Sequence, residues 1–354
     1  MISLYRPYMP DSLPELDGIL HSGALNYGKW GREFEMRLKQ FIGNENLIST
    51  NTYSNAIHIA LATLGLQPGD EVIASPMACL ASNQPLVTYG LKVRWADIDP
   101  NTGTLDPESV SRVVTARTKL VFHNQFCGYV GYLQEIYDIA HSQGLMVIDD
   151  CVEAFGSENN GKKMGNLGAD ATVFSFQTVR LPNTIEGGAI SFSDSSLSEK
   201  AVLIRDFGID RFRFRDENAE ISPDCDISLK GYAGTMSEVN SYIGCVQMGT
   251  ISDLLEKQRG NAIDWKRMLD RVSPQVKPLP VLPGGMPNYW VFGVLSENKK
   301  RDLLTFREQG YYASGVHLPN SFYSVFGSSL TLKGVKEFNN KFFAIPCGWW
   351  MNHV

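Results

Sequence analysis

The feature that most constrains the fold is a regular alternation of short apolar runs with amphipathic segments of helical length through the middle of the chain. The pattern predicts strands at 92–97, 119–122 and 145–150, and helices at 106–116 and 132–143. Strands that alternate with helices form a parallel sheet that is covered by helices on both faces. We therefore predict an α/β fold.

Two strand-to-loop junctions supply the first candidate site residues. The predicted strand at 145–150 ends in two carboxylates, Asp149 and Asp150, and ligands of parallel sheets bind beyond the carboxyl ends of the strands. Ser54 lies at the start of a predicted helix that follows a short strand at 46–49. A helix N-terminus in this position can hold a phosphate, whereas the ordinary role of such a serine is to cap the helix.

Composition excludes several classes of protein. The 354 residues are 43% hydrophobic and 20% charged, which is ordinary for a globular protein. The formal net charge of −6 predicts no nucleic-acid binding, and no apolar run reaches the roughly 20 residues that span a membrane. Residues 1–7 lack the apolar core of a signal peptide, and the six cysteines form no CxxC pair. We therefore predict a cytoplasmic protein with reduced thiols and no metal site.

One loop carries a specific motif. It reads Ser-Phe-Gln-x-x-Arg at 175–180 and closes on Glu-Gly-Gly at 186–188, just before a second apolar strand. The loop resembles the coenzyme-lysine loop of the DegT/StrS sugar aminotransferases, a branch of the fold-type-I enzymes that use pyridoxal phosphate (PLP). The pattern of that family is Ser-Phe-His-x-x-Lys, followed by Glu-Gly-Gly. Here Gln177 stands at the histidine position and Arg180 stands at the lysine position.

Matches to the same family extend over nearly the whole chain, including Gly-Asp-Glu-Val-Ile at 69–73 and Gly-Tyr-x-x-x-Met-Ser at 231–237. The resemblance implies a PLP-transferase-like architecture of fold type I. It consists of a large domain at 1–250, with an N-terminal interface segment and a mainly parallel seven-stranded sheet flanked by helices, and a smaller α/β domain at 251–354. The resemblance also implies a homodimer, a nucleotide-sugar substrate or ligand, and a part in amino- or deoxy-sugar and surface-polysaccharide synthesis.

The resemblance places the family's site on a defined set of residues. Asp150 would pair with the pyridinium nitrogen of PLP, or of pyridoxamine phosphate (PMP), and keep that nitrogen protonated. Glu153 stands where the family has Gln or His, and His317 belongs to an element that lines the substrate cleft. The remaining coenzyme-binding positions hold Ser54, Tyr53, Cys79, Ser175 and Gln177.

Four positions depart from the family pattern in ways that bear on chemistry. Arg180 replaces the coenzyme lysine, Cys79 replaces the aromatic ring that stacks on the coenzyme, and Tyr53 replaces a glycine of the phosphate turn. Ala233 replaces an asparagine that reaches the partner subunit's phosphate site. A guanidinium stays protonated and is not nucleophilic, so Arg180 is suited either to holding an anion in a bidentate grip or to a structural ion pair.

Two hypotheses follow from these matches and departures. In the first, the chain is a sugar aminotransferase or a PMP-type sugar dehydratase that uses Asp150 and Ser54 to hold the coenzyme. In the second, it is a coenzyme-free relative that binds a nucleotide sugar, or that runs acid–base chemistry with Asp149, Asp150, Glu153 and His317 around Arg180. A structural partner for an active relative is a third class.

Overall fold

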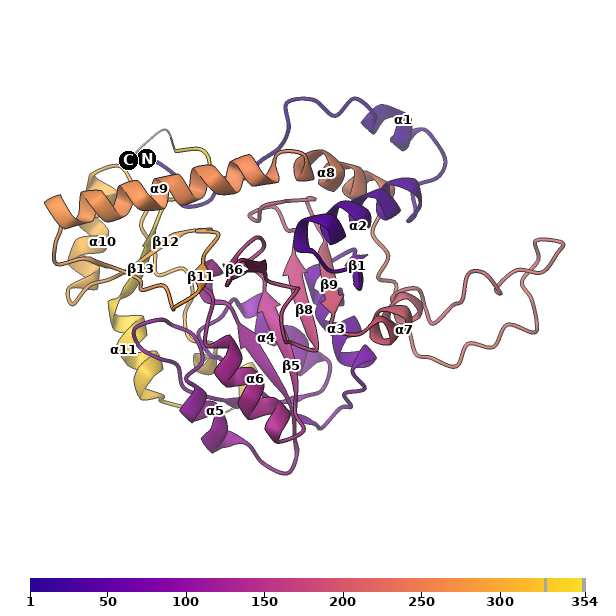
Figure 1. Cartoon of the computed structure of the whole chain (residues 1–354), viewed down its shortest axis with the longest axis horizontal. Helices are drawn as coiled ribbons and strands as arrows, with labels where there is room; N and C mark the ends of the chain where they lie inside the picture. Colours follow the sequence, from indigo (N-terminus) through magenta and orange to yellow (C-terminus); the bar gives the residue numbers. More distant parts are fainter. Residues whose placement is uncertain (328–329, 352–354) are drawn as a thin grey trace.

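The centre of the molecule is a seven-stranded sheet (Figure 1). The computed structural model describes residues 1–327 and 330–351. The strand order is β1-β9-β8-β5-β4-β2-β3, and all strands run parallel except β9, which is antiparallel to both of its neighbours. The strands are β1 (Leu47–Thr50), β2 (Glu71–Ala74), β3 (Lys92–Trp95), β4 (Thr118–Asn124), β5 (Met146–Cys151), β8 (Ala171–Ser175) and β9 (Gly188–Phe192). The predicted α/β fold with a mainly parallel seven-stranded sheet is confirmed.

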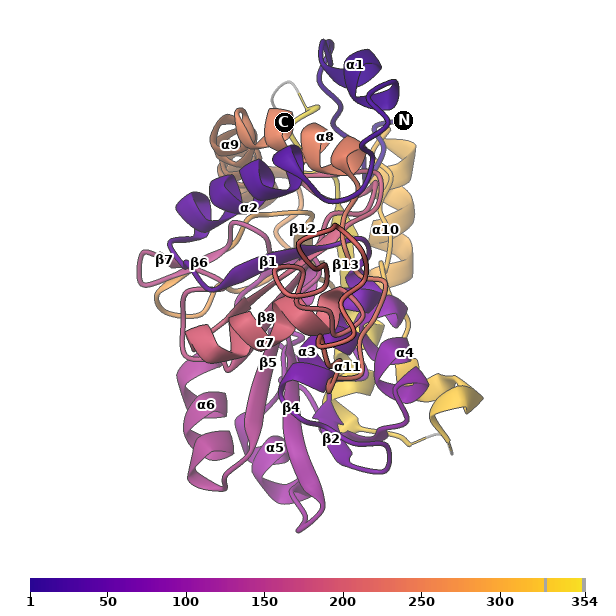
Figure 2. The same cartoon turned by 90° about the vertical axis from the view of Figure 1, so that its right-hand side faces the viewer.

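Helices cover both faces of this sheet because its strands are apolar on both sides. In β5, Val147 belongs to the apolar cluster on one face and Ile148 to the cluster on the other. One face carries α3 (Tyr53–Thr63), α4 (Leu80–Thr88) and α7 (Ser195–Arg205). The other carries α2 (Lys29–Ile42), α5 (Pro107–Val113) and α6 (Leu133–Ser142), with α8 (Glu238–Met248) packed on α2 and the short α1 (Leu16–Leu20) on α8. Figure 2 shows α7 and α3 on the near side of the sheet, with α2 and α8 above it.

The start of α3 differs in detail from the sequence-based expectation. The helix begins at Tyr53, and its cap is Thr52, whose side chain accepts a hydrogen bond from the Asn55 backbone N–H. Ser54 already lies inside the first turn, with its side chain exposed. The capping role considered for Ser54 therefore belongs to Thr52, two residues earlier in the chain.

The C-terminal part of the chain forms a second layer around an apolar cluster that also includes side chains of the large sheet's loops, such as Met77 and Phe126. It begins with the 22-residue helix α9 (Ile251–Val272), followed by the three-stranded sheet β10-β12-β13. The elements of this layer are β10 (Lys277–Pro278), β12 (Phe292–Leu295), α10 (Lys299–Glu308), α11 (Lys333–Lys341) and β13 (Phe342–Ile345), with the short 3-10 turns η2 (Asn320–Phe322) and η3 (Ser324–Phe326).

Segments from both parts of the sequence meet in a third, small sheet. Strand β11 (Gly285–Met286) pairs with β6 (Glu158–Asn159), which pairs in turn with β7 (Lys162–Lys163). The division into domains at residue 250 stays a prediction.

A long segment between α7 and α8 extends away from the body of the molecule (Figure 1, right). Its side chains are mostly exposed, and Phe212 within it is 99% exposed. No helix in the described ranges, 1–327 and 330–351, is both long and apolar enough to cross a membrane.

Candidate functional site around Arg180 and Asp150

The candidate residues gather beyond the carboxyl ends of the parallel strands. Arg180 follows β8, Glu153 follows β5, and Cys79 follows β2. The 3-10 turn η1 (Phe126–Gly128) follows β4 and lies beside them. The C-terminal layer adds His317, which comes from the loop before η2. Loops at this edge of a parallel sheet are where ligands bind in α/β proteins.

Arg180 is buried, with only 6% of its side chain exposed. Its Nη2 lies 3.5 Å from Oε1 of Glu153, and its guanidinium carbon lies 4.4 Å from the ring centroid of Trp290. The Trp290 ring is fixed in turn, because its Nε1–H donates to the Val179 carbonyl at 2.9 Å and the ring of Tyr5 stacks on it with centroids 4.7 Å apart. Arg180 is thus positioned by an ion pair and by a cation–π contact.

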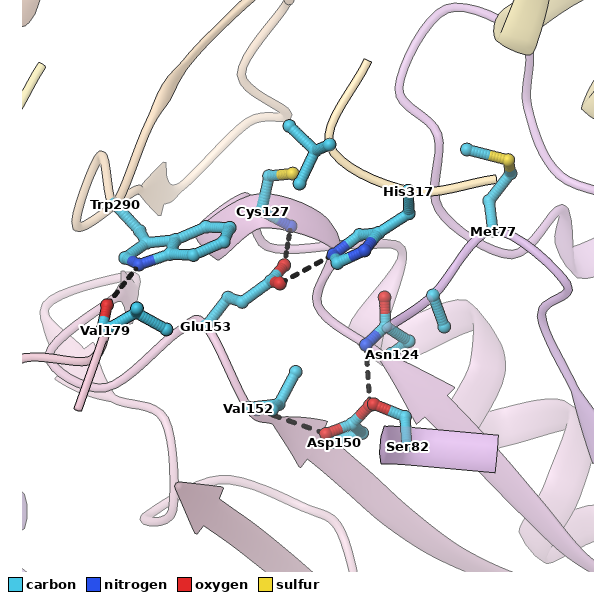
Figure 3. A network of polar contacts seen from close by, with 12 residues as sticks. Met77, Ser82, Asn124, Cys127, Asp150, Val152, Glu153, Val179, Trp290 and His317 are labelled. Atoms are coloured by element: carbon cyan, nitrogen blue, oxygen red, sulfur yellow. Dashed lines mark hydrogen bonds and ion pairs between the residues drawn. The ribbon is translucent and has the colours of Figure 1, made fainter. Parts of the chain in front are cut away.

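Glu153 is the anionic centre of this group (Figure 3). Its Oε1 lies 2.8 Å from Nε2 of His317, and its Oε2 accepts a hydrogen bond from the Cys127 backbone N–H at 2.9 Å. Burial alone would raise the pKa of this carboxyl. The charges of His317 and Arg180 and the Cys127 N–H outweigh burial, so the pKa of Glu153 is lowered and the carboxylate stays ionised.

Two of the donor nitrogens of Arg180 lack a partner within residues 1–327 and 330–351. Its Nε and Nη1 are buried and make no hydrogen bond to any described residue. An unpaired buried donor on a charged group is costly, typically 1–3 kcal/mol or more, so these N–H groups call for an acceptor. A planar fork of this kind matches the oxygens of a carboxylate or a phosphate.

Asp150 lies in a separate network below Glu153 in Figure 3. Its Oδ1 accepts hydrogen bonds from the Tyr53 hydroxyl and from the Val152 backbone N–H, the latter at 3.1 Å. Its Oδ2 accepts from Nδ2 of Asn124 at 2.6 Å. Burial raises the pKa of Asp150, although hydrogen bonds from Tyr53, Ser82 and Asn124 act in the opposite direction.

Tyr53 comes from the first turn of α3 and is 1% exposed. Burial, and then the charge of Asp150, raise the pKa of the phenol well above its ordinary value, so the hydroxyl is neutral and acts as a donor. Cys79 packs against the apolar cluster that contains the Tyr53 ring, and burial raises the pKa of its thiol to about 11. Two of the replaced coenzyme positions, 53 and 79, therefore belong to the same apolar region.

The structure does not bring every predicted residue to Arg180. Asp149 projects to the opposite face of the sheet from Asp150, where its carboxylate accepts a hydrogen bond from Tyr137 of α6. Ser175 is buried at the end of β8, and its hydroxyl accepts from the Gln177 backbone N–H at 3.4 Å. Of the predicted residues, Glu153 forms the ion pair with Arg180, and His317 contacts Glu153.

Sequence reasoning missed several residues that shape the site. Trp290 and Tyr5 orient Arg180, and Asn124 and the Cys127 N–H orient the two carboxylates. Trp290 lies just before β12, and its contact with Arg180 spans more than a hundred residues of sequence. No local pattern signals such a contact. The position of Asn124 at the end of β4, beside β5, is a signal that strand order could have supplied.

One grouping of metal-ligating side chains exists among the described residues, and it overlaps the site. Donor atoms of Cys79, Glu153 and His317 lie within 4.8 Å of one another. A set of this type can bind zinc. Here, however, Oε1 of Glu153 already faces both His317 and Arg180, and Oε2 accepts the Cys127 N–H. The carboxylate is committed to protein partners.

The coenzyme implied by the sequence motifs does not fit the residues present. Arg180 offers no amine that could form a covalent link to PLP. Both oxygens of Asp150, the expected partner of the pyridinium nitrogen, are engaged by protein donors. Cys79 provides no aromatic surface for a stacked ring.

Comparisons with a family model and with known proteins point to the same family. The model of the DegT/DnrJ/EryC1/StrS aminotransferase family matches residues 9–347. GDP-perosamine synthase of Caulobacter vibrioides is 30% identical over 81% of this chain and 77% of its own length. The spore coat polysaccharide biosynthesis protein SpsC of Bacillus subtilis is 27% identical over 87% of this chain and 80% of its own.

A solved structure agrees with the sequence comparisons. The crystal structure of the sugar aminotransferase CalS13 from Micromonospora echinospora has a TM-score of 0.92 to this chain at 25% identity. The match covers 99% of this chain and 96% of that one. The chain therefore belongs to the DegT/DnrJ/EryC1/StrS aminotransferase family.

Proposed function

We propose that this chain is a coenzyme-independent member of the family that binds a nucleotide sugar, with Arg180 as the anchor for an oxyanion of the ligand. The setting is the one that the relatives' names describe, nucleotide-sugar and polysaccharide biosynthesis. The anchored group is either a carboxylate on the sugar or the diphosphate, since both present the paired oxygens that a guanidinium recognises.

The observation that carries this proposal is the state of the Arg180 side chain. It is buried, it is held in place by Glu153 and Trp290, and two of its donor nitrogens have no partner in the part of the chain that the structure describes. A purely structural ion pair at this position would be expected to use those donors. Glu153 faces only Nη2 of Arg180 and shares its oxygens with His317 and the Cys127 N–H, so Nε and Nη1 of Arg180 remain as donors for an oxygen of the ligand.

The contacts favour binding over acid–base chemistry. The lowered pKa of Glu153 makes it a weak base at neutral pH. Asp150 is fully buried and enclosed by Tyr53, Asn124 and Val152, and the Asp149 side chain lies on the other face of the sheet. Both aspartates are therefore engaged by protein donors rather than by Arg180.

The test is isothermal titration calorimetry with UDP-glucose, UDP-glucuronate and UDP, each against the wild type and Arg180→Gln. We expect at least one ligand to bind the wild type and to lose tenfold or more in affinity in the variant, about 1.4 kcal/mol. Equal loss for all three ligands assigns the contact to the diphosphate, and loss confined to UDP-glucuronate assigns it to the sugar carboxylate. Arg213→Gln, which changes an exposed arginine, is the matched control.

Two results would overturn the proposal. One is the absence of binding by all three ligands and by the corresponding GDP and dTDP sugars. The other is binding that Arg180→Gln leaves unchanged.

Two further parts of the proposal concern assembly and location. We propose a homodimer, as the family resemblance implies. The projecting segment between α7 and α8, with Phe212 fully exposed, supports a role in contacts with a second chain. Light scattering of the purified protein measures this directly. A cytoplasmic location is supported by the six cysteines, all of which are free thiols.

A further inference from the structure

We propose that Tyr53 is a built-in occupant of the family's coenzyme-ring site, so that its phenol excludes PLP and PMP by taking the place of the pyridine ring on Asp150. This inference explains the loss of the coenzyme. It does not depend on which ligand Arg180 holds.

The first step of the argument is the path of the Tyr53 side chain. The family resemblance fixes two anchors for the coenzyme, a phosphate at the start of the helix that is α3 here and a pyridinium nitrogen at Asp150. Tyr53 begins at the first of these anchors, since it is the first residue of α3, and its hydroxyl donates to Asp150 at the second. A molecule that joined the two anchors would have to cross the space that this side chain fills.

The second step is the hydrogen bonding of Asp150. A protonated pyridine ring nitrogen offers one N–H to this carboxylate, and the phenol offers one O–H. The Tyr53 hydroxyl takes that place on Oδ1, while Val152 and Asn124 supply donors that any occupant would leave in position. The buried carboxylate is therefore satisfied without a coenzyme, as a buried charge requires.

The third step is the pairing of two size changes. The family has a glycine where this chain has Tyr53, and an aromatic ring where this chain has Cys79. Cys79 packs against the apolar cluster that holds the Tyr53 ring. The ring gained at position 53 offsets the ring lost at position 79, so the interior stays filled. The two changes are complementary parts of one repacking.

The test restores the amine and the space separately. Three variants are compared with the wild type: Arg180→Lys, Arg180→Lys with Tyr53→Gly, and Arg180→Lys with Tyr53→Phe. Each is incubated with PLP, reduced with borohydride, desalted and analysed by intact mass and absorbance. The introduced amine condenses with the PLP aldehyde and releases water. Borohydride then delivers hydride to the resulting C=N bond, and water supplies the proton that completes a stable secondary amine.

We expect the variant that combines Arg180→Lys with Tyr53→Gly to carry PLP at position 180 in at least a tenfold larger fraction than Arg180→Lys alone. Tyr53→Phe keeps the ring and should leave labelling at the level of the single variant. Peptide mapping excludes labelling at Lys162, Lys163 and other lysines. Near-ultraviolet circular dichroism confirms that each variant is folded.

The Arg180→Lys variant keeps the test decisive even where Tyr53→Gly fails to fold. If Arg180→Lys alone retains PLP at position 180 stoichiometrically, Tyr53 does not exclude the ring and the proposal is overturned. A folded Tyr53→Gly combination that retains no more PLP than Arg180→Lys overturns it as well. Nucleotide-sugar binding is measured on the wild type without coenzyme, so the proposed function stands or fails on separate results.

Discussion

The hydrogen bond between Tyr53 and Asp150 gives a prediction whose magnitude can be worked from the structure. Tyr53→Phe keeps the buried ring and removes only the hydroxyl. Asp150 would retain Asn124 on Oδ2 and the Val152 N–H on Oδ1, so one of its donors is lost. A hydrogen bond to a buried charged group is worth about 1.5–3 kcal/mol, and no cavity term is added because the ring remains.

We therefore expect Tyr53→Phe to lower the free energy of unfolding by about 1.5–3 kcal/mol at pH 7. The assay is urea denaturation followed by fluorescence, with the midpoint shifted and the slope unchanged. Tyr312→Phe is the control, because Tyr312 is substantially exposed and its hydroxyl makes no hydrogen bond to a described residue. A Tyr53→Phe variant within about 0.5 kcal/mol of the wild type, the range of ordinary surface changes, would refute the reasoning.

Three other predictions follow from the buried charges. The pKa of Glu153 is lowered from its ordinary value of 4.5, so the carboxylate stabilises the fold above that pH and loses this effect as pH falls through the folded-state pKa. The Glu153→Gln variant should therefore be less stable than the wild type at pH 7. Between pH 5 and pH 3 its melting temperature should fall by less than that of the wild type. The Nη1 of Arg205 donates hydrogen bonds to the buried Glu35 carboxylate and to the Ser49 carbonyl. In the same urea assay, Arg205→Met should lower the free energy of unfolding by about 3–5 kcal/mol, because it leaves Glu35 buried without its partner. A loss below about 1 kcal/mol would contradict a stabilising role for this ion pair. Dialysis against EDTA should leave the melting temperature unchanged, and mass spectrometry should find less than one-tenth equivalent of bound metal, because both oxygens of Glu153 already bind protein partners. If EDTA instead removed one equivalent of metal and lowered the stability, Cys79 and His317 would be metal ligands.

Much of the fold could be predicted from the sequence, because it depends on local patterns. The alternation of strands and helices gave the parallel sheet, and the motif matches gave its number of strands. The start of α3 was placed within one residue, but the cap was not. Thr52 and Ser54 are both good capping residues, and only the backbone geometry at Thr52, extended at φ −147° and ψ 157°, decides between them.

The site was harder to predict because its contacts join distant parts of the chain. Asp149 and Asp150 are adjacent in sequence, and the two-residue period of a strand separates them to opposite faces. Arg180, Glu153 and His317 were recognised as candidates, but not the role of Trp290. The role of Tyr53 depends on where a flexible side chain points. The family resemblance implies only that a glycine is replaced, and the contact of the new side chain with Asp150 is seen only in the folded structure.

The stacked pair of Tyr5 and Trp290 has a consequence for the order in which the chain folds during its synthesis on the ribosome. During translation Tyr5 leaves the ribosome 285 residues before Trp290, so among the described residues its ring has no stacking partner until Trp290 follows. His317, which completes the contacts of Glu153, emerges later still. The parallel sheet can form while the chain is growing, since its last strand ends at Phe192. The contacts around Arg180 are therefore completed after the strands of the sheet have been made, when segments far apart in the nascent chain meet.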